Sequence, residues 1–230
     1  MNKFRNIIYQ VLKFILVLPF VNLVRIMKIF AYDFGYLRSA FTYQSIDRDG
    51  NPIPWFSYSA IEYLDSLDLS KKDVFEFGTG NSTVYWAKNA RSVAGIENNE
   101  SWLSYVKNQT LKFKNVKLTF EKNKNQYANA LSKLKRKFDI IIIDGENRQE
   151  CVNIAIKQLK RGGLIILDNS DWYPKTCRSL HNIGFTEINF SGFGPINPYC
   201  TTTSFFILKS LDFKHNAKHF SPKNHIGAIR

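Results

Sequence analysis

The sequence predicts an α/β protein with a doubly wound, mainly parallel sheet, and two observations carry this prediction. From about residue 74 to 208, short apolar segments alternate with segments of helical pattern. One of them, FDIIIID (138–144), is apolar along almost its whole length, as expected of a central parallel strand that is buried on both faces. Strands that alternate with helices imply right-handed crossovers between neighbouring parallel strands.

The N-terminal residues form a separate apolar extension, which we place at residues 1–44. Its longest stretch without a charge, residues 14–24, is shorter than the ~20 residues that cross a bilayer. Polar residues recur every three or four positions on either side of Pro19. This pattern predicts two amphipathic helices that flank a proline bend. They lie in a membrane interface, cap the domain core or, if Lys13 snorkels, span the membrane.

A polar connector (residues 45–54) opens the main domain, which we expect to cover residues 45–210 and to precede a basic tail at 211–230. Periodicity and turn residues place the elements in order along the chain. We expect helices at 57–67, 82–90, 99–112, 126–136, 149–160 and 173–182. We expect strands at 74–77, 92–97, 116–120, 138–144, 164–168 (after a Gly162-Gly163 turn), 185–190 and 202–208.

The composition is that of a folded domain in a reducing compartment. Apolar residues make up 44% and aromatic residues 15% of the 230 residues, which suffices for a substantial core. The three cysteines are too few and too scattered for a disulfide framework or a Cys-x-x-Cys zinc site. We therefore expect reduced thiols and a cytoplasmic protein, at the inner face of the membrane if the extension binds lipid.

The net charge of +13 is concentrated in particular stretches. Residues 1–28 contain five basic residues and no acidic one, and residues 107–137 contain ten basic residues against Glu121. These charged side chains either lie on solvated helix faces or attract polyanions. An anionic membrane surface is one such partner, and residues 1–30 are the candidate segment for binding it. If residues 107–137 lie on the same side, they add to that attraction. Nucleic acid is a disfavoured partner, because no nucleic-acid-binding motif accompanies the charge.

The segment that follows the first strand has the features of a cofactor loop. Gly78 and Gly80 let a ligand approach the backbone closely, and the helix start that follows offers free N–H groups. A dinucleotide fingerprint would place a third glycine at Thr83, so that fingerprint fails. Glu97 ends the next strand, where a carboxylate can bind ribose hydroxyls. The candidate cofactor-binding residues are Glu76, Gly78, Thr79, Gly80, Asn81, Ser82, Glu97, Asp144 and Gly145.

These motifs resemble the class I S-adenosylmethionine-dependent methyltransferases. The resemblance rests on EFGTGNS (76–82), Glu97, FDIIIIDG (138–145), GGLIILDN (162–169) and TTSFFIL (202–208). It implies a seven-stranded, mostly parallel, Rossmann-like sheet in which TTSFFIL is the inserted antiparallel strand. It also implies S-adenosyl-L-methionine above Gly78 and Gly80, its ribose on Glu97 and its methionine end near Glu76. The sequence Lys122-Asn123-Lys124 departs from relatives that carry an acid near the adenine.

Asp144 and the pair Asp168-Asn169 follow two neighbouring central strands, and we take Asp144 and Asp168 as the catalytic candidates. One interpretation is a Mg²⁺ site of the catechol O-methyltransferase type, with Asp144, Asp168 and Asn169 as ligands that activate an acceptor hydroxyl. In the other, Asp144 contacts the cofactor or acts as a general base, and Asp168-Asn169 ends a strand.

Three further residues are candidates for binding the acceptor. Arg148 could clamp an anionic acceptor, and Asp171 and Trp172 could line its pocket. Residues 192–199 form a Gly- and Pro-rich loop that either covers the site or is a plain turn.

The function expected from these features is methyl transfer to a hydroxyl, or another oxygen or nitrogen, of a small-molecule or glycan acceptor. The alternatives are a catalytically inactive membrane-surface binding protein and a dinucleotide or nucleotide-sugar enzyme.

Overall fold

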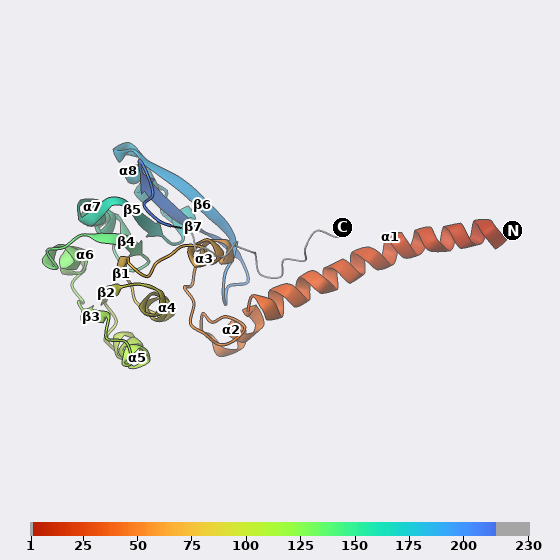
Figure 1. Cartoon of the computed structure of the whole chain (residues 1–230), viewed down its shortest axis with the longest axis horizontal. Coiled ribbons are helices and arrows are strands. Elements are labelled where there is room, and N and C mark those ends of the chain that lie inside the picture. The colour runs from red at the N-terminus through yellow and green to blue at the C-terminus, as the bar shows by residue number, and fades with distance from the viewer. Residues whose placement is uncertain (1, 215–230) are drawn as a thin grey trace.

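The computed structural model describes residues 2–214, so most of the expected tail at 211–230 lies outside the described residues. It contains one seven-stranded sheet with the order β3-β2-β1-β4-β5-β7-β6 (Figure 1). Strands β1 to β5 run parallel, and β7 is inserted antiparallel between β5 and β6. The predicted doubly wound, mostly parallel sheet is therefore confirmed, including its inserted antiparallel strand.

Most elements lie close to the expected positions. The strands are β1 (Asp73–Phe77), β2 (Ser92–Glu97), β3 (Val116–Phe120), β4 (Phe138–Ile143), β5 (Leu159–Leu167), β6 (Phe185–Phe193) and β7 (Cys200–Leu208). The helices of the main domain are α3 (Tyr58–Asp65), α4 (Asn81–Asn89), α5 (Glu100–Thr110), α6 (Lys124–Lys133), α7 (Arg148–Gln158), α8 (Pro174–Ile183) and the short 3₁₀ helix η2 (Ser170–Trp172).

Two hydrophobic layers sandwich the sheet. Along β4, Ile141 and Ile143 pack in the layer that contains α6, α7 and α8, whereas Ile140 and Ile142 pack in the layer that contains α3 and α4. Successive side chains of a strand point to opposite faces. An uninterrupted apolar strand is therefore what a sheet covered on both faces requires.

The glycine pair before the fifth strand does not form the expected turn. Gly162 and Gly163 lie inside β5, which begins at Leu159 and whose pairing with β4 shifts register between Phe138 and Ile140. A Cβ on Gly163 would lie 2.8 Å from the carbonyl oxygen of Asp139. The glycines therefore serve an irregular strand with close backbone contact rather than a separate connection.

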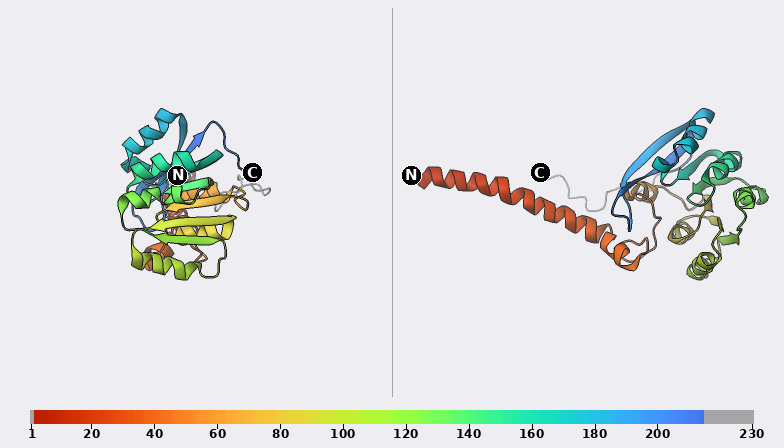
Figure 2. Two further views of the ribbon diagram at one scale, coloured as in Figure 1. Left: turned by 90° about the vertical axis from the view of Figure 1, so that its left-hand side faces the viewer. Right: turned by 180° about the vertical axis from the view of Figure 1, so that it is seen from behind.

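The prediction of two N-terminal helices with a proline bend is wrong. A single helix, α1 (Asn2–Lys28), contains Pro19 and continues into the π-helical turn η1 (Ile29–Asp33) and the short helix α2 (Tyr36–Thr42). A proline removes one backbone hydrogen bond and bends a helix, but bonds on either side can continue it. Figures 1 and 2 show α1 projecting away from the domain. Within residues 2–214, no helix combines the length and apolarity needed to cross a bilayer.

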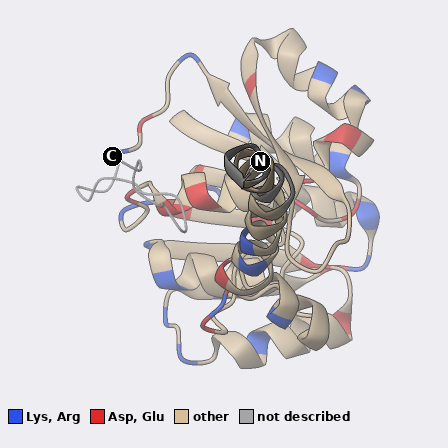
Figure 3. Ribbon diagram, turned by 90° about the vertical axis from the view of Figure 1, so that its right-hand side faces the viewer, with Lys and Arg blue, Asp and Glu red and all other residues tan. Residues whose placement is uncertain are grey.

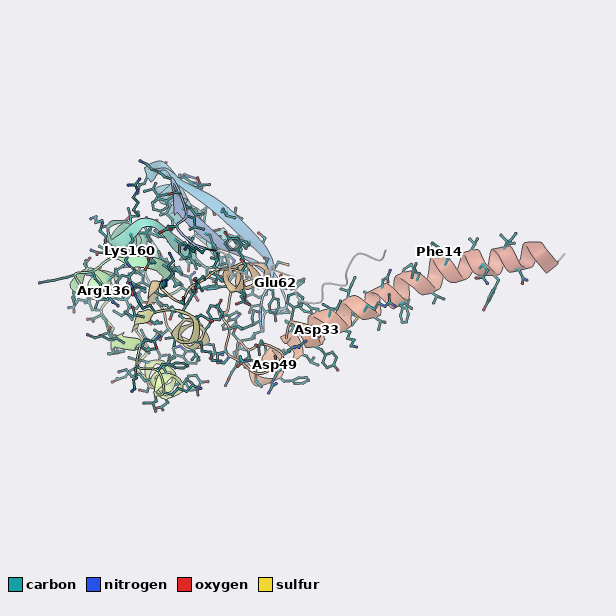
Figure 4. All side chains as sticks on the ribbon, viewed as in Figure 1. Phe14, Asp33, Asp49, Glu62, Arg136 and Lys160 are labelled. Carbon is teal, nitrogen blue, oxygen red and sulfur yellow. The ribbon has the colours of Figure 1, made fainter. Side chains whose placement is uncertain are left out.

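The basic stretch at 107–137 does not lie beside α1. It covers the last turn of α5, all of β3 and α6 and the loop to β4, at the β3 edge of the sheet. Figure 4 shows Arg136 of this stretch on the side of the domain opposite to α1. The expectation that both basic segments act on one surface is therefore not supported by their placement.

Candidate functional site

The carboxyl ends of β1, β2, β4 and β5 surround a cavity of about 780 Å³. This volume is within the range of small-molecule and cofactor pockets. Of the residues predicted from the sequence, those that line it are Gly78, Thr79, Gly80, Asn81, Ser82, Glu97, Asp144, Gly145, Arg148, Asp168, Asn169 and Trp172. The parallel sheet thus brings residues far apart in sequence to one edge, as predicted, whereas Glu76 and Asp171 do not line the cavity.

The backbone conformation at position 78 requires a glycine. Its φ is +88°, a conformation that L side chains rarely adopt. A Cβ there would lie 2.8 Å from the carbonyl oxygen of Asp144 and 3.1 Å from the Cα of Gly145. The loops after β1 and β4 are therefore in contact, which positions Asp144 relative to the glycine loop. Gly80 has an extended φ of 179° and no such constraint.

Glu97 ties the glycine loop to the end of β2. Its Oε2 accepts hydrogen bonds from the Thr79 backbone N–H (3.0 Å) and hydroxyl (3.2 Å). Its Oε1 accepts from the backbone N–H groups of Asn98 (3.0 Å) and Asn99 (3.1 Å). Four donors satisfy the two oxygens of this buried carboxylate, so Glu97 shapes the site as well as facing it.

Trp102 is a lining residue that the sequence reasoning missed. Its indole Nε1 donates to the carbonyl of Thr79 at 2.6 Å, and its ring stacks on Tyr105 at 5.1 Å. Trp102 lies on the first turn of α5, where Asn99 caps the helix by accepting from the Trp102 backbone N–H. A large aromatic residue one turn after the strand-ending acid is the signal that could have identified it.

Glu76 lies within the protein beneath the loop. Its side chain is fully buried, and neither carboxyl oxygen meets hydrogen-bond geometry with any of residues 2–214. Burial raises the pKa of Glu76 to about 8, the nearby Thr83 and Ser82 hydroxyls limit the rise, and the charge of Asp144 adds to it. A buried carboxyl without a partner, next to a cavity, is typical of a site that receives a charged ligand.

Asp144 and Arg148 form the charged centre of the cavity. The Arg148 NH2 group donates to Asp144 Oδ1 at 3.0 Å, and its Nε donates to the Gly145 carbonyl at 3.1 Å. A third donation goes to the backbone carbonyl of Asp168, and the guanidinium lies 4.6 Å from the centre of the Tyr173 ring. Burial raises the pKa of Asp144 to about 6, and Arg148 opposes this rise. Arg148, the first residue of α7, is thus held by the loop that carries Asp144 and by the end of β5.

The donor set does not fit the Mg²⁺ site proposed from the sequence. Asp168 is 3% exposed and its Oδ1 accepts from the Thr203 hydroxyl at 2.6 Å, while the Asn169 amide donates to Thr201 at 2.8 Å. The Arg148 guanidinium supplies the positive charge beside Asp144. Across the described part of the chain, no three acidic, histidine or cysteine side chains gather as metal ligands. Burial, followed by the charge of Asp144, raises the pKa of Asp168, which favours its neutral form.

Two of the three acceptor candidates have other contacts in this structure. The Asp171 carboxylate accepts from the backbone N–H of Thr202 at 3.0 Å, so it holds the start of β7. Arg148 is engaged as described above. Trp172 is 58% exposed and lines the cavity.

The remaining wall of the cavity, which we call the aromatic wall, is mainly aromatic and comes from two segments outside the parallel strands. Tyr43 and Trp55 flank the connector before α3, with ring centroids 6.4 Å apart, and Asn197 and Tyr199 come from the β6–β7 loop. The loop at 192–199 therefore borders the site, which was one of its two interpretations. Tyr43 and Gln44 precede the domain boundary expected at residue 45, yet they line the cavity.

A comparison with known protein families matches part of the chain. Residues 75–170 match a family described as "Methyltransferase domain". A comparison with curated proteins gives no match.

Solved structures share the fold at low sequence identity. An rRNA methylase from Clostridium thermocellum has a TM-score of 0.53 and 12% identity, with 69% of this chain and 99% of that chain covered. An O-methyltransferase from Klebsiella pneumoniae has a TM-score of 0.50 and 18% identity, with 66% and 78% covered. A Streptococcus mutans methyltransferase, solved in complex with S-adenosylhomocysteine, has a TM-score of 0.50 and 15% identity, with 64% and 94% covered. Identities this low show the shared fold alone, and the match to the methyltransferase-domain family is confined to residues 75–170, less than half of the chain.

Proposed function

We propose that the protein transfers a methyl group from S-adenosylmethionine to a hydroxyl of a small-molecule or glycan acceptor. The observation that carries this proposal is the position of Asp144: its carboxyl, 31% exposed, lines the same cavity as the glycine loop and the aromatic wall, and its backbone contacts the glycine loop. A group there can contact both a cofactor on the loop and an acceptor on the wall.

The residues present fit this cofactor. Gly78 and Gly80 put no side chain on the part of the loop that lines the cavity, and the strand that leads into the loop carries the buried Glu76, whose carboxyl meets hydrogen-bond geometry with none of residues 2–214. Of the four donors on Glu97, the Thr79 hydroxyl alone can rotate away without moving the backbone. We infer that ribose hydroxyls replace this one bond and leave the other three intact.

S-adenosylmethionine supplies a methyl group on a positively charged sulfur, so the protein mainly has to align the acceptor and accept its proton. Transfer of the methyl group would break its bond to sulfur and release S-adenosylhomocysteine, and the Asp144 carboxylate would take the proton that the acceptor hydroxyl loses as its oxygen binds the methyl carbon. A base with a pKa of about 6 is ionised at neutral pH and still takes up a proton effectively. Arg148 holds this carboxylate in place and keeps it ionised. Asp168, whose pKa is raised, accepts from the Thr203 hydroxyl, which in turn accepts from the Ser57 backbone N–H two residues after Trp55.

Binding measurements separate this proposal from its two rivals. Thermal shift with S-adenosylhomocysteine and with NAD distinguishes a methyltransferase from a dinucleotide enzyme. We expect a shift with the former and none with the latter.

The alternative of an inactive binding protein is tested by incubating the protein with methyl-labelled cofactor and a host extract. Labelled product in the parent and none in Asp144→Asn supports catalysis. Equal labelling by both proteins contradicts the role of Asp144.

A further inference from the structure

Many of the described side chains of helix α1 are apolar and exposed. The large ones include Ile7, Phe14 (69% exposed), Phe20 (65%), Leu23 and Ile26. Figure 4 shows Phe14 on the projecting part of the helix, away from every other described element. An exposed apolar surface of this size marks a binding site.

Charge identifies the occupant of this surface. Residues 1–28 contain five basic residues and no acidic one. Figure 3, viewed along the helix, shows basic residues on the turns near the domain. Two copies of the helix that pair side by side would bring like charges together, whereas anionic lipid headgroups attract each basic residue. An anionic bilayer therefore fits the helix better than a second copy of the chain does.

The exposed apolar surface continues from α1 to the cavity. Tyr32 of η1, Leu37 and Phe41 of α2, and Tyr43 directly after α2 are all exposed, Phe41 by 83% and Tyr43 by 75%. Tyr43 lines the cavity together with Trp55. The surface that begins on α1 thus ends at the rim of the candidate active site.

The turn that continues α1 packs against the domain close to the segments that form the rim. The Phe30 ring lies 4.5 Å from Tyr36, 6.1 Å from Tyr58 and 5.3 Å from Phe193, and Phe34 lies 4.8 Å from Tyr58. Phe193 leads into the loop whose Asn197 and Tyr199 form part of the acceptor wall. These contacts fix the orientation of α1 relative to the acceptor side of the cavity. A membrane that binds α1 therefore lies at a defined position relative to that side.

We propose that α1 binds an anionic lipid bilayer and that η1 and α2 hold the aromatic rim of the cavity at the bilayer surface. The acceptor is then a hydroxyl of a membrane-resident amphiphile, such as a lipid headgroup or a lipid-linked sugar. This second part rests on the proposed methyl transfer. Tyr43 and Trp55 suit the position, because amphipathic aromatic rings favour the membrane–water interface.

Flotation with vesicles tests the docking surface on the full chain. We expect the protein to float with vesicles of phosphatidylcholine and phosphatidylglycerol and to float less with pure phosphatidylcholine. The double variant Phe14→Glu/Phe20→Glu should weaken binding about tenfold or more, since two apolar contacts are replaced by charges that anionic lipid repels. Leu111→Glu is the matched control, because Leu111 is 80% exposed at the end of α5, on the basic side of the domain. A protein that stays in solution as a dimer, or equal flotation of both variants, contradicts the proposal.

Tryptophan quenching by brominated phosphatidylcholine, mixed into the anionic vesicles, tests the placement of the rim. We expect Trp55→Phe to lose most of the lipid-dependent quenching and Trp102→Phe to keep it. The opposite result shows that the rim faces away from the bilayer and contradicts the placement. Neither measurement uses the cofactor, so a failure to bind S-adenosylhomocysteine would overturn the proposed function and leave the docking result standing.

The acceptor class has its own test. The parent is incubated with methyl-labelled cofactor and either a host lipid extract reconstituted in anionic vesicles or the water-soluble host fraction. We expect label in the lipid phase, and none there with Asp144→Asn. Label in the soluble fraction alone, or no label in lipid from a protein that binds S-adenosylhomocysteine, contradicts a membrane-resident acceptor.

Discussion

Arg148 NH2 lies 3.0 Å from Asp144 Oδ1, and the same guanidinium donates to the backbone of both loops that carry the central acids. The Arg148 guanidinium therefore positions the carboxyl of Asp144, which we assign as the proton acceptor, and favours its ionised form. Most of the catalytic predictions follow from this pair.

Replacing Arg148 by Met should raise the pKa of Asp144. The guanidinium opposes the rise caused by burial, and its loss leaves burial unopposed. An adjacent opposite charge shifts a carboxyl pKa by roughly 1–3 units, so an increase of that order above about 6 is expected. Carbon-13 NMR titration of the aspartate carboxyls measures it, with Asp144→Asn for assignment. Arg161→Met, at an exposed arginine, should leave the Asp144 titration unchanged; an unchanged titration in Arg148→Met itself would show that the pair does not control Asp144.

Glu76→Gln should stabilise the protein at high pH. The pKa of Glu76 rises from its ordinary 4.5 to about 8 on folding, so the folded state holds this proton more tightly than the unfolded state does. The stability that the proton contributes is complete below pH 4.5 and is lost as the pH rises to 8. A shift of this size corresponds to on the order of 5 kcal/mol, and glutamine removes the dependence.

The measurement is the difference in free energy of unfolding between Glu76→Gln and the parent at pH 5, 7 and 9. The difference should move in favour of the variant as the pH increases. A difference that is constant across this range would mean that Glu76 does not titrate as proposed.

Gly78→Ala and Gly80→Ala should differ sharply in stability. The first places a Cβ 2.8 Å from the Asp144 carbonyl at a φ of +88°, which costs roughly 1–3 kcal/mol. The second meets only the Trp102 ring at 3.7 Å, an ordinary contact, and should change the free energy of unfolding by about 0.5 kcal/mol or less. Urea unfolding of both variants checks this, and equal stabilities would refute the close contact between the two loops.

The parallel core could be predicted from sequence because its signals are local. The run FDIIII of β4 and the glycines at 78 and 80 each report on one strand or one loop, and the structure places them as expected. The helix α1 was mispredicted since Pro19 indicates a bend, whereas the neighbouring hydrogen bonds decide whether the helix continues.

The site residues that directly follow a strand could be predicted from the sequence. Those that reach the cavity through tertiary packing could not. Sequence spacing indicates that Asp144 and Asp168 share an edge, but not that Arg148 binds between their loops. Tyr43, Trp55 and Tyr199 reach the cavity from segments more than 140 residues apart along the chain, which no local pattern reveals. The four donors on Glu97 likewise come from two loops.

The central claim is that S-adenosylmethionine binds on the glycine loop with its ribose on Glu97, and calorimetric titration with S-adenosylhomocysteine tests it most directly. We predict one equivalent bound by the parent and an affinity about 10- to 100-fold lower in Glu97→Ala, the scale of a hydrogen bond to a charged group. Thr79→Val, which removes only the hydroxyl that the ribose is proposed to displace, should retain binding. No binding by the folded parent at millimolar ligand, or equal affinities in the parent and Glu97→Ala, would contradict the account.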